Sequence, residues 1–378
     1  MQLSETIKLY LSKEQKILIV QTMNEYISTV NGLVSNAVNG ISINKYTSKD
    51  VNAKLPSALS NQCIRDAKSI IRKYHKALFK TAETNKSLEK QGKSVFLKET
   101  SVPVLKRPCC YINNQNFKVK EDCLEFPIWF NGKTMRLSVS VILTKRQKAL
   151  FEGAKLGTMR IVFKGHKIVA QIVYDVPDVE YKESGNVMGI DLGIKCPAVS
   201  YISDGNIKFY GNGRKNKYMR RHYKYLRNKL QKAKRIEAVK RIDDKEQRIM
   251  KDIDHKISHD IIQTAVAHNV KVIKLERLAN IRSTTRKSRK NNHSLHTWSF
   301  YRLSQFIEYK AKLAGIKVEY VNPAYTSQTC PVCGHVHHAN DRNYVCRCGL
   351  HIHRDLLGAM NICNSTEYVG DSNIRHTA

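Results

Sequence analysis

Four cysteines near the C-terminal end of the chain constrain its folding more than any other feature. Cys330 and Cys333 form a Cys-x2-Cys pair, and after twelve residues Cys346 and Cys348 form a Cys-x-Cys pair. A glycine follows each pair and suits a tight turn that points two thiolates at one ion. Two such pairs supply the four soft ligands of one tetrahedral structural Zn²⁺. We therefore predict a zinc ribbon over residues 327–351.

The second cysteine pair leaves one alternative open. Its one-residue spacer is tighter than the usual two, so a histidine could take the place of one thiolate. The histidines close enough in sequence are His335, His337, His338 and His351. We keep the four cysteines as the first choice.

Net charge narrows the class of partner. The 378 residues include 65 Lys and Arg against 32 Asp and Glu, a formal charge of +33. This excess repels itself unless a polyanion is bound, so we predict a nucleic-acid-binding protein. We expect no membrane association, because the chain has no amphipathic anchor, no lipidation motif and no run of about 20 apolar residues. A polar start without a secretory signal, and ten cysteines that do not form a disulfide framework, predict a cytoplasmic location.

The basic residues are concentrated in one segment. Residues 214–251 hold 16 Lys or Arg and 4 Asp or Glu, a net charge of +12. A solvated helix face is the ordinary explanation of such a run. Here Tyr218, Tyr223 and Tyr225 are interleaved with the cations, and this favours a surface that contacts nucleic-acid phosphates. The basic loop at 282–290 adds further cations for the same purpose.

Local patterns along the chain predict a multidomain α+β protein. An alternating, strand-like start is followed by Ser12 and Gln15, which predict a capping box. Helical patterns run to about residue 38 and from about 58 to 82, so residues 13–90 are predicted to form a helical domain. Short strand-like runs over residues 91–180 predict a small β barrel or sandwich that the first strand can join. The C-terminal half has an α/β pattern, in which the lack of Gly and Pro over 214–268 predicts long helices.

Three carboxylates in the C-terminal half are candidates for a common site. Asp191 lies in an apolar strand pattern, where a buried carboxylate needs a cation or hydrogen-bond donors beside it. Glu276 ends a second apolar strand pattern, and Asp355 begins a helical pattern. Singly, each acid has an ordinary structural explanation. Together, three carboxylates could hold two Mg²⁺ ions that activate a water and stabilise the leaving oxygen of a phosphodiester.

These motifs together resemble the TnpB (OrfB) family of bacterial insertion sequences, which is related to compact type V CRISPR effector nucleases. The resemblance covers the C-terminal half, with GIDLG at 189, IKLERL at 273, WSFYRL at 298, AYTSQTCPVCG at 324 and CGLHIHRDLLGAMNI at 348. It implies that Asp191, Glu276 and Asp355 are the catalytic acids of the three RuvC motifs. It also implies that the zinc ribbon is inserted just before the third motif.

The resemblance implies a domain plan as well. Residues 1–12 and 91–180 correspond to a β-barrel wedge domain, and residues 13–90 to its helical recognition insert. Residues 181–326 and 352–378 correspond to a RuvC-like (RNase H-like) α/β nuclease domain. The activity implied is that of an RNA-guided DNA endonuclease, in which a guide RNA pairs with target double-stranded DNA and the RuvC site cuts it.

The third motif departs from the family pattern. Where the family often has Asp-Arg-Asp followed by Asn-Ala-Ala, this chain has His353-Arg354-Asp355 and then Leu357-Gly358-Ala359. No catalytic carboxylate is lost, but asparagine contacts near the site are in doubt. A miniature CRISPR effector with the same chemistry, a DNA-binding regulator that does not cut, and a transposase that moves DNA ends remain as alternatives. The sequence does not indicate the oligomeric state.

Overall fold

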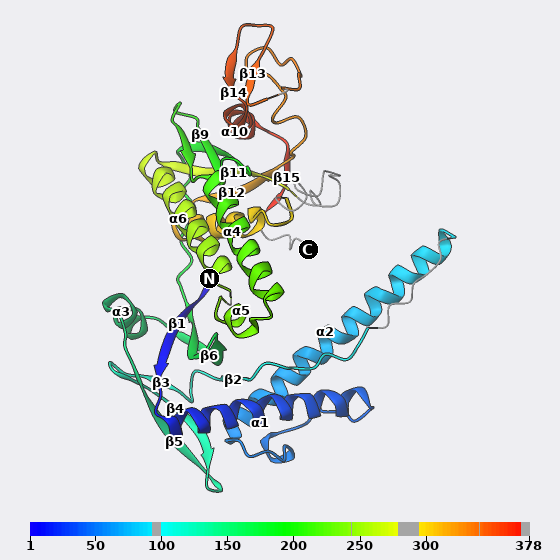
Figure 1. Cartoon of the computed structure of the whole chain (residues 1–378), viewed down its shortest axis with the longest axis vertical. Helices are drawn as coiled ribbons and strands as arrows, with labels where there is room; N and C mark the ends of the chain where they lie inside the picture. Colours follow the sequence, from blue (N-terminus) through cyan, green and yellow to red (C-terminus); the bar gives the residue numbers. More distant parts are fainter. Residues whose placement is uncertain (93–99, 243, 279–294, 340, 372–378) are drawn as a thin grey trace. The chain divides into compact units, whose positions relative to one another are not determined.

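The structure is a computed structural model that describes residues 1–92, 100–242, 244–278, 295–339 and 341–371. The chain divides into two compact units, Met1–Pro177 and Asp178–Ala378, which are described separately (Figure 1). No helix among the described residues has the length and apolarity that a membrane crossing requires.

The first unit is built on a seven-stranded sheet in the order β2-β6-β7-β1-β5-β4-β3. Its elements are β1 (Gln2–Tyr10), α1 (Lys13–Val38), a 3-10 turn (Ser48–Asp50), α2 (Ser57–Lys90), β2 (Cys109–Ile112), β3 (Lys118–Val119), β4 (Cys123–Phe130), β5 (Lys133–Val141), α3 (Lys145–Gly153), β6 (Leu156–Lys164) and β7 (Lys167–Asp175). Strand β1 pairs antiparallel with β7 over seven residues and meets β5 at its end. The first strand therefore joins a sheet whose other strands follow the two long helices in sequence.

Local sequence explains the start of α1 and the length of α2. The hydroxyl of Ser12 accepts a hydrogen bond from the backbone N–H of Gln15, whose side chain accepts one from the Ser12 N–H, and this confirms the predicted capping box. Helix α2 runs through the lysine-rich residues 84–90, which the apolar pattern did not include. These residues are good helix formers, and no glycine interrupts them before Gly92.

The second unit is built on a six-stranded sheet in the order β10-β9-β8-β11-β12-β15. Its elements are β8 (Asn186–Asp191), β9 (Ala198–Ile202), β10 (Ile207–Tyr210), α4 (Gly213–Lys232), α5 (Ile236–Ile242), α6 (Lys245–Ala267), β11 (Val270–Glu276), α9 (Phe300–Leu313), β12 (Lys317–Val321), β13 (Asn343–Val345), β14 (His351–His353), α10 (Arg354–Asn364) and β15 (Tyr368–Asp371). The basic segment without Gly or Pro, residues 214–268, thus forms the three successive helices α4, α5 and α6. Strands β8, β11 and β12 are parallel at the centre, and apolar side chains of β8, β11, α6 and α9 form the core.

Candidate active site

Two neighbouring strands deliver the first two acids of the site. Strands β8 and β11 are parallel and in register, with Ile190 opposite Leu275, and both of these side chains are fully buried. Asp191 and Glu276 each follow one residue later. Because parallel strands end at the same edge of a sheet, the two carboxylates reach the same edge, where open α/β sheets place their ligand sites.

Helix α10 brings the third acid to this edge. The imidazole of His353 caps its first turn by accepting a hydrogen bond from the Asp355 N–H at 3.3 Å, and the Asp355 residue is 8% exposed. The helix lies directly on β8 at Gly189, where any side chain would overlap the backbone of Ala359 and Cys363. This close approach requires glycine and seats Asp355 beside the end of β8.

All three acids line one cavity of about 680 Å³. Burial raises the pKa of Asp191 well above its ordinary value, and the nearby charges of Glu276 and Asp355 raise it further. Burial likewise raises the pKa of Glu276, although a hydrogen bond from Thr326 opposes this rise. Burial and mutual repulsion destabilise three ionised carboxylates, and a bound cation would stabilise them.

Two residues that sequence reasoning missed contact these acids directly. The hydroxyl of Thr326 donates a hydrogen bond to Glu276. The guanidinium of Arg342 lies 2.5 Å from both carboxylate oxygens of Asp355. Arg342 stands at the start of the β13–β14 hairpin, whereas Thr326 precedes the cysteine segment. No spacing rule singles out either residue, because each contact depends on how that segment packs.

Side-chain hydrogen bonds also hold α10 in place. The amide of Asn361 donates to the carbonyl oxygens of Thr326 at 2.8 Å and Thr329 at 2.7 Å. At the end of the helix, the ammonium of Lys274 donates to the carbonyl oxygens of Cys363 at 3.0 Å and Ser365 at 2.7 Å. The strand that carries Glu276 thus also caps the helix that carries Asp355.

Gly358, where the family often has alanine in the third motif, packs beside the side chain of Asp191. A Cβ at Gly358 would stand 3.3 Å from Cγ of Asp191 and 3.4 Å from its Oδ2. That distance is tighter than ordinary van der Waals contact, so glycine leaves more room beside the carboxylate than alanine would. An asparagine contact is still present one turn later, through Asn361.

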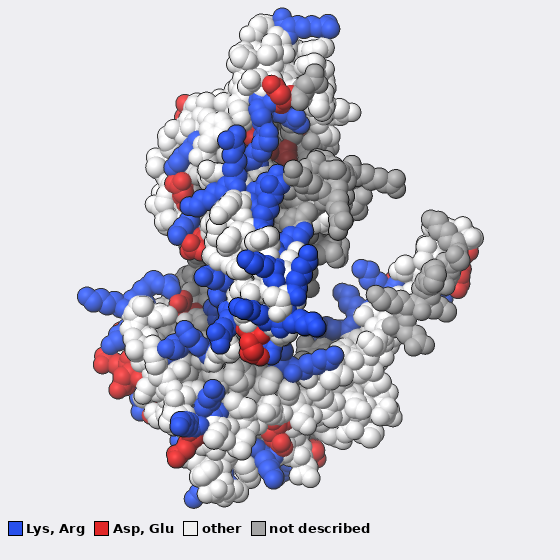
Figure 2. Space-filling model, viewed as in Figure 1, with Lys and Arg blue, Asp and Glu red and all other residues white. Residues whose placement is uncertain are grey.

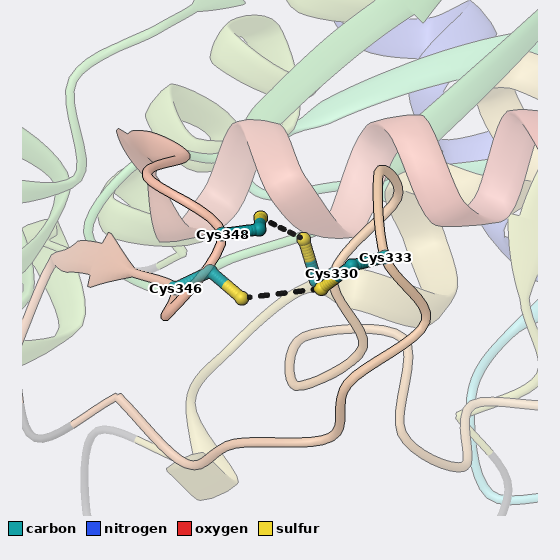
Figure 3. A group of neighbouring side chains, drawn as sticks. All are labelled: Cys330, Cys333, Cys346 and Cys348. Carbon is teal, nitrogen blue, oxygen red and sulfur yellow. Dashed lines mark hydrogen bonds between the residues drawn. The ribbon is translucent and has the colours of Figure 1, made fainter.

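The four predicted cysteines converge in the same unit (Figure 3). Their sulfur atoms all lie within 4.8 Å of one another, and the Sγ atoms of Cys330 and Cys348 are 3.6 Å apart. Those of Cys333 and Cys346 are 3.5 Å apart. Among the described residues no histidine joins this group, so the structure favours the four-cysteine ligand set over the histidine alternative. Burial opposes ionisation of the Cys330 thiol, but the backbone N–H groups of Cys333 and Val332 outweigh it and lower its pKa to about 7. Four thiolates at these separations suit a tetrahedral Zn²⁺.

Basic side chains gather over α4 on the face shown in Figure 2. Tyr218 and Tyr225 on this helix are exposed by 64% and 67%, whereas Tyr223 is buried. The helix therefore packs on one side and presents cations and aromatic rings on another, as its composition predicts. The basic loop at 282–290 lies outside the described residues.

Comparisons with known proteins agree on the family. Residues 171–282 match the OrfB IS605 model, described as a probable transposase, and residues 300–362 match the Cas12f1-like TNB domain. A TnpB-like protein of Methanocaldococcus jannaschii is 32% identical over 253 residues, which cover 62% of this chain and 88% of that relative. A CRISPR-associated endodeoxyribonuclease Cas12f1 of Sulfoacidibacillus thermotolerans is 31% identical over 216 residues, covering 52% of this chain and 50% of that relative.

Solved structures support the same relationship at the level of the fold. A Cas12f1 in a complex with sgRNA and target DNA superposes with a TM-score of 0.58 at 15% identity, covering 97% of this chain and 99% of that one. A mini-RNA-guided endonuclease, Cas_phi3, superposes with a TM-score of 0.54 at 12% identity, covering 96% and 92%. Given its match along most of an archaeal relative, this chain belongs to the TnpB-like protein family.

Proposed function

We propose that this protein is an RNA-guided DNA endonuclease of an insertion sequence, and that it cuts DNA by metal-assisted hydrolysis of a phosphodiester. The observation that carries the proposal is the convergence of Asp191, Glu276 and Asp355 on one cavity, from two adjacent strands and a helix. The similarity to a CRISPR-associated endodeoxyribonuclease, together with membership in the TnpB-like family, supports the same activity.

The residues of the cavity fit a hard divalent cation. All three acids offer oxygen ligands, which Mg²⁺ prefers. Burial and the charges of Glu276 and Asp355 raise the pKa of Asp191, although Arg342 and Arg354 partly oppose this rise. Asp191, Glu276 and Asp355 would hold two Mg²⁺ ions, which supply an activated water and a stabilised leaving oxygen when bound.

Other side chains would orient these ligands and the substrate. The Thr326 hydroxyl fixes one oxygen of Glu276, and the Arg342 guanidinium fixes both oxygens of Asp355. Lys195 and Arg354 also line the cavity. Their positive charges suit the phosphates on either side of the bond to be cut, because phosphate contacts position a strand without reading its sequence.

A guide RNA and a target double-stranded DNA are the proposed partners. The excess of cations and the basic face of α4 offer enough positive charge for an RNA and a DNA together. The first solved neighbour is itself described as bound to sgRNA and target DNA. In such a system base pairing reads the target, and the protein recognises backbone shape and a short flanking motif.

The two compact units support the assignment of separate domains to this function. We assign residues 1–12 and 91–180 to a wedge domain, 13–90 to a helical recognition insert, and 181–326 with 352–378 to a RuvC-like nuclease domain. Residues 327–351 would be a ribbon in which Cys330, Cys333, Cys346 and Cys348 hold one structural Zn²⁺. A miniature type V CRISPR effector is the second candidate, since residues 300–362 match the Cas12f1-like domain.

Cleavage assays on acid variants test the proposed site. We expect Asp191→Ala, Glu276→Ala and Asp355→Ala each to abolish Mg²⁺-dependent cutting of guide-matched DNA, because each removes a ligand. Binding of RNA and DNA should persist, because the cations lie elsewhere. Wild-type cutting by any one of the three variants would contradict the assignment.

A rewritten guide tests the RNA dependence. Purified protein should carry RNA, and the position of the cut in a plasmid should follow the guide segment when that segment is changed. Site-specific cutting by RNase-treated protein would instead indicate a nuclease or transposase that reads DNA itself. The flanking genomic DNA, either a transposon end or a CRISPR array, separates the two guided candidates.

A further inference from the structure

A second cavity, of about 390 Å³, lies next to the acid-lined one and has no part in the proposed metal site. Gly193 lines both cavities, and it follows Asp191 by only two residues. Two residues of extended chain span at most about 7 Å, so the two cavities are neighbours on the scale of one or two nucleotides. The volume is typical of sites that enclose a small organic group.

One stripe of α4 forms the basic wall of this second cavity. The residues of the helix that line it follow one another at intervals of three, one, three, one and three: Gly213, Asn216, Lys217, Arg220, Arg221 and Lys224. This spacing keeps them on one face of the helix. Arg220 lies 3.9 Å from Glu246, whereas Lys217, Arg221 and Lys224 form no ion pair with any described residue. Three cations on this wall therefore remain available to a ligand.

The rest of the lining includes apolar side chains, one of which is aromatic. These include Trp298, Met250 and Leu303. The single acid in the lining, Asp254, is 2% exposed and is already paired, with Nη2 of Arg302 at 2.6 Å and the Ser299 hydroxyl at 3.2 Å. Since this carboxylate is neutralised, the cavity combines a positive rim with an apolar, aromatic interior.

We propose that this cavity holds one unstacked nucleobase of the DNA strand that enters the acid-lined cavity. A nucleobase matches the apolar, aromatic interior, and its flanking phosphates match the cations of α4. The DNA strand is favoured over the RNA because the shared wall at Gly193 places the base beside the phosphate to be cut. This inference rests on the proposed function and adds a positioning site to it.

Filling the cavity tests the proposal. Asn216 lines it and is half-buried, so Asn216→Phe should occupy the space of the base. Asn228→Phe is the matched control, because Asn228 is exposed on the same helix and does not line the cavity. Both changes are made in full-length, RNA-bound protein that also carries Asp191→Ala, so that bound DNA stays intact.

The readout is photocrosslinking from single 4-thiothymidine residues placed along each DNA strand near the cut. We expect one narrow position to crosslink to peptides 213–224 or 295–303, and Asn216→Phe to reduce the yield about tenfold, the effect of losing one stacked base. Asn228→Phe should leave the yield unchanged. No crosslink to these peptides from DNA, crosslinks only from 4-thiouridine in the RNA, or equal yields in the two variants would each overturn the proposal.

A parallel cleavage assay with wild-type protein, prepared in the same way, distinguishes failure of the base-binding site from failure of the proposed function. If wild-type protein cuts guide-matched DNA but DNA does not crosslink to the cavity, only the base-binding site is refuted. If wild-type protein does not cut guide-matched DNA, the proposed function fails and this inference falls with it.

Discussion

Lys274→Met should destabilise the second unit by removing the cap at the end of α10. The ammonium of Lys274 donates to the carbonyl oxygens of Cys363 and Ser365 at 3.0 Å and 2.7 Å. Each hydrogen bond from a charged donor contributes about 1.5–3 kcal/mol. Because the lysine is half-exposed and keeps part of its hydration, we take the lower value for each bond, about 3 kcal/mol in all.

The expected effect is large enough to measure by thermal unfolding. For a unit of this size, 1 kcal/mol lowers Tm by roughly 2–4 °C, so Lys274→Met should lower it by roughly 6–12 °C. Lys271→Met is the matched control, since Lys271 lies on the same strand, is also half-exposed and forms no side-chain hydrogen bond or ion pair with a described residue. Unfolding should be followed by circular dichroism and, in a Trp129→Phe background, by the fluorescence of Trp298, which then reports on the second unit.

Cleavage should respond less than stability does. The lost bonds lie at the end of the helix, eight residues from Asp355, a distance of about 12 Å along the axis. Well below its Tm, the Lys274→Met variant should therefore cut guide-matched DNA at close to the wild-type rate. Equal Tm values for Lys274→Met and Lys271→Met would refute the capping argument.

Three further predictions concern metals and packing. Metal analysis should find about one Zn²⁺ per chain, and Cys330→Ser or Cys346→Ser should lose it and loosen the segment before Asp355; a metal-free protein that stays ordered there would contradict this. The Mg²⁺ concentration that half-saturates cleavage should rise as pH is lowered, and this rise should begin above the ordinary carboxyl range, because the raised pKa values of Asp191 and Glu276 let protons compete with the metal there; an unchanged requirement would argue against these carboxylates as ligands. Gly189→Ala should reduce soluble, folded protein sharply, because its methyl group would overlap the backbone of α10, whereas Gly205→Ala, at an open turn, should have a smaller effect in the same expression and unfolding assay.

Features encoded over a few residues could be predicted from the sequence. The spacing of Cys330, Cys333, Cys346 and Cys348 places two thiols at each of two tight turns, and this predicts the four-cysteine group that the structure contains. The capping box at Ser12 is likewise a contact between residues three positions apart. Strand and helix patterns were enough to place Glu276 near the end of a strand and Asp355 at the start of a helix, because hydrophobic periodicity is a local property. They placed Asp191 within a strand, whereas β8 ends at that residue.

The sequence by itself determined which carboxylates and cysteines are candidates for the sites, and only the tertiary structure decided which residues lie together. Asp191 meets Glu276 because β8 and β11 pair in register, and Asp355 joins them because Gly189 lets α10 lie against β8. The contacts of Arg342 and Lys274 and the cavity behind Gly193 join residues from segments that no periodic pattern relates. Their partners are selected by packing, since the orientation of one element on another depends on the shapes of all the side chains between them.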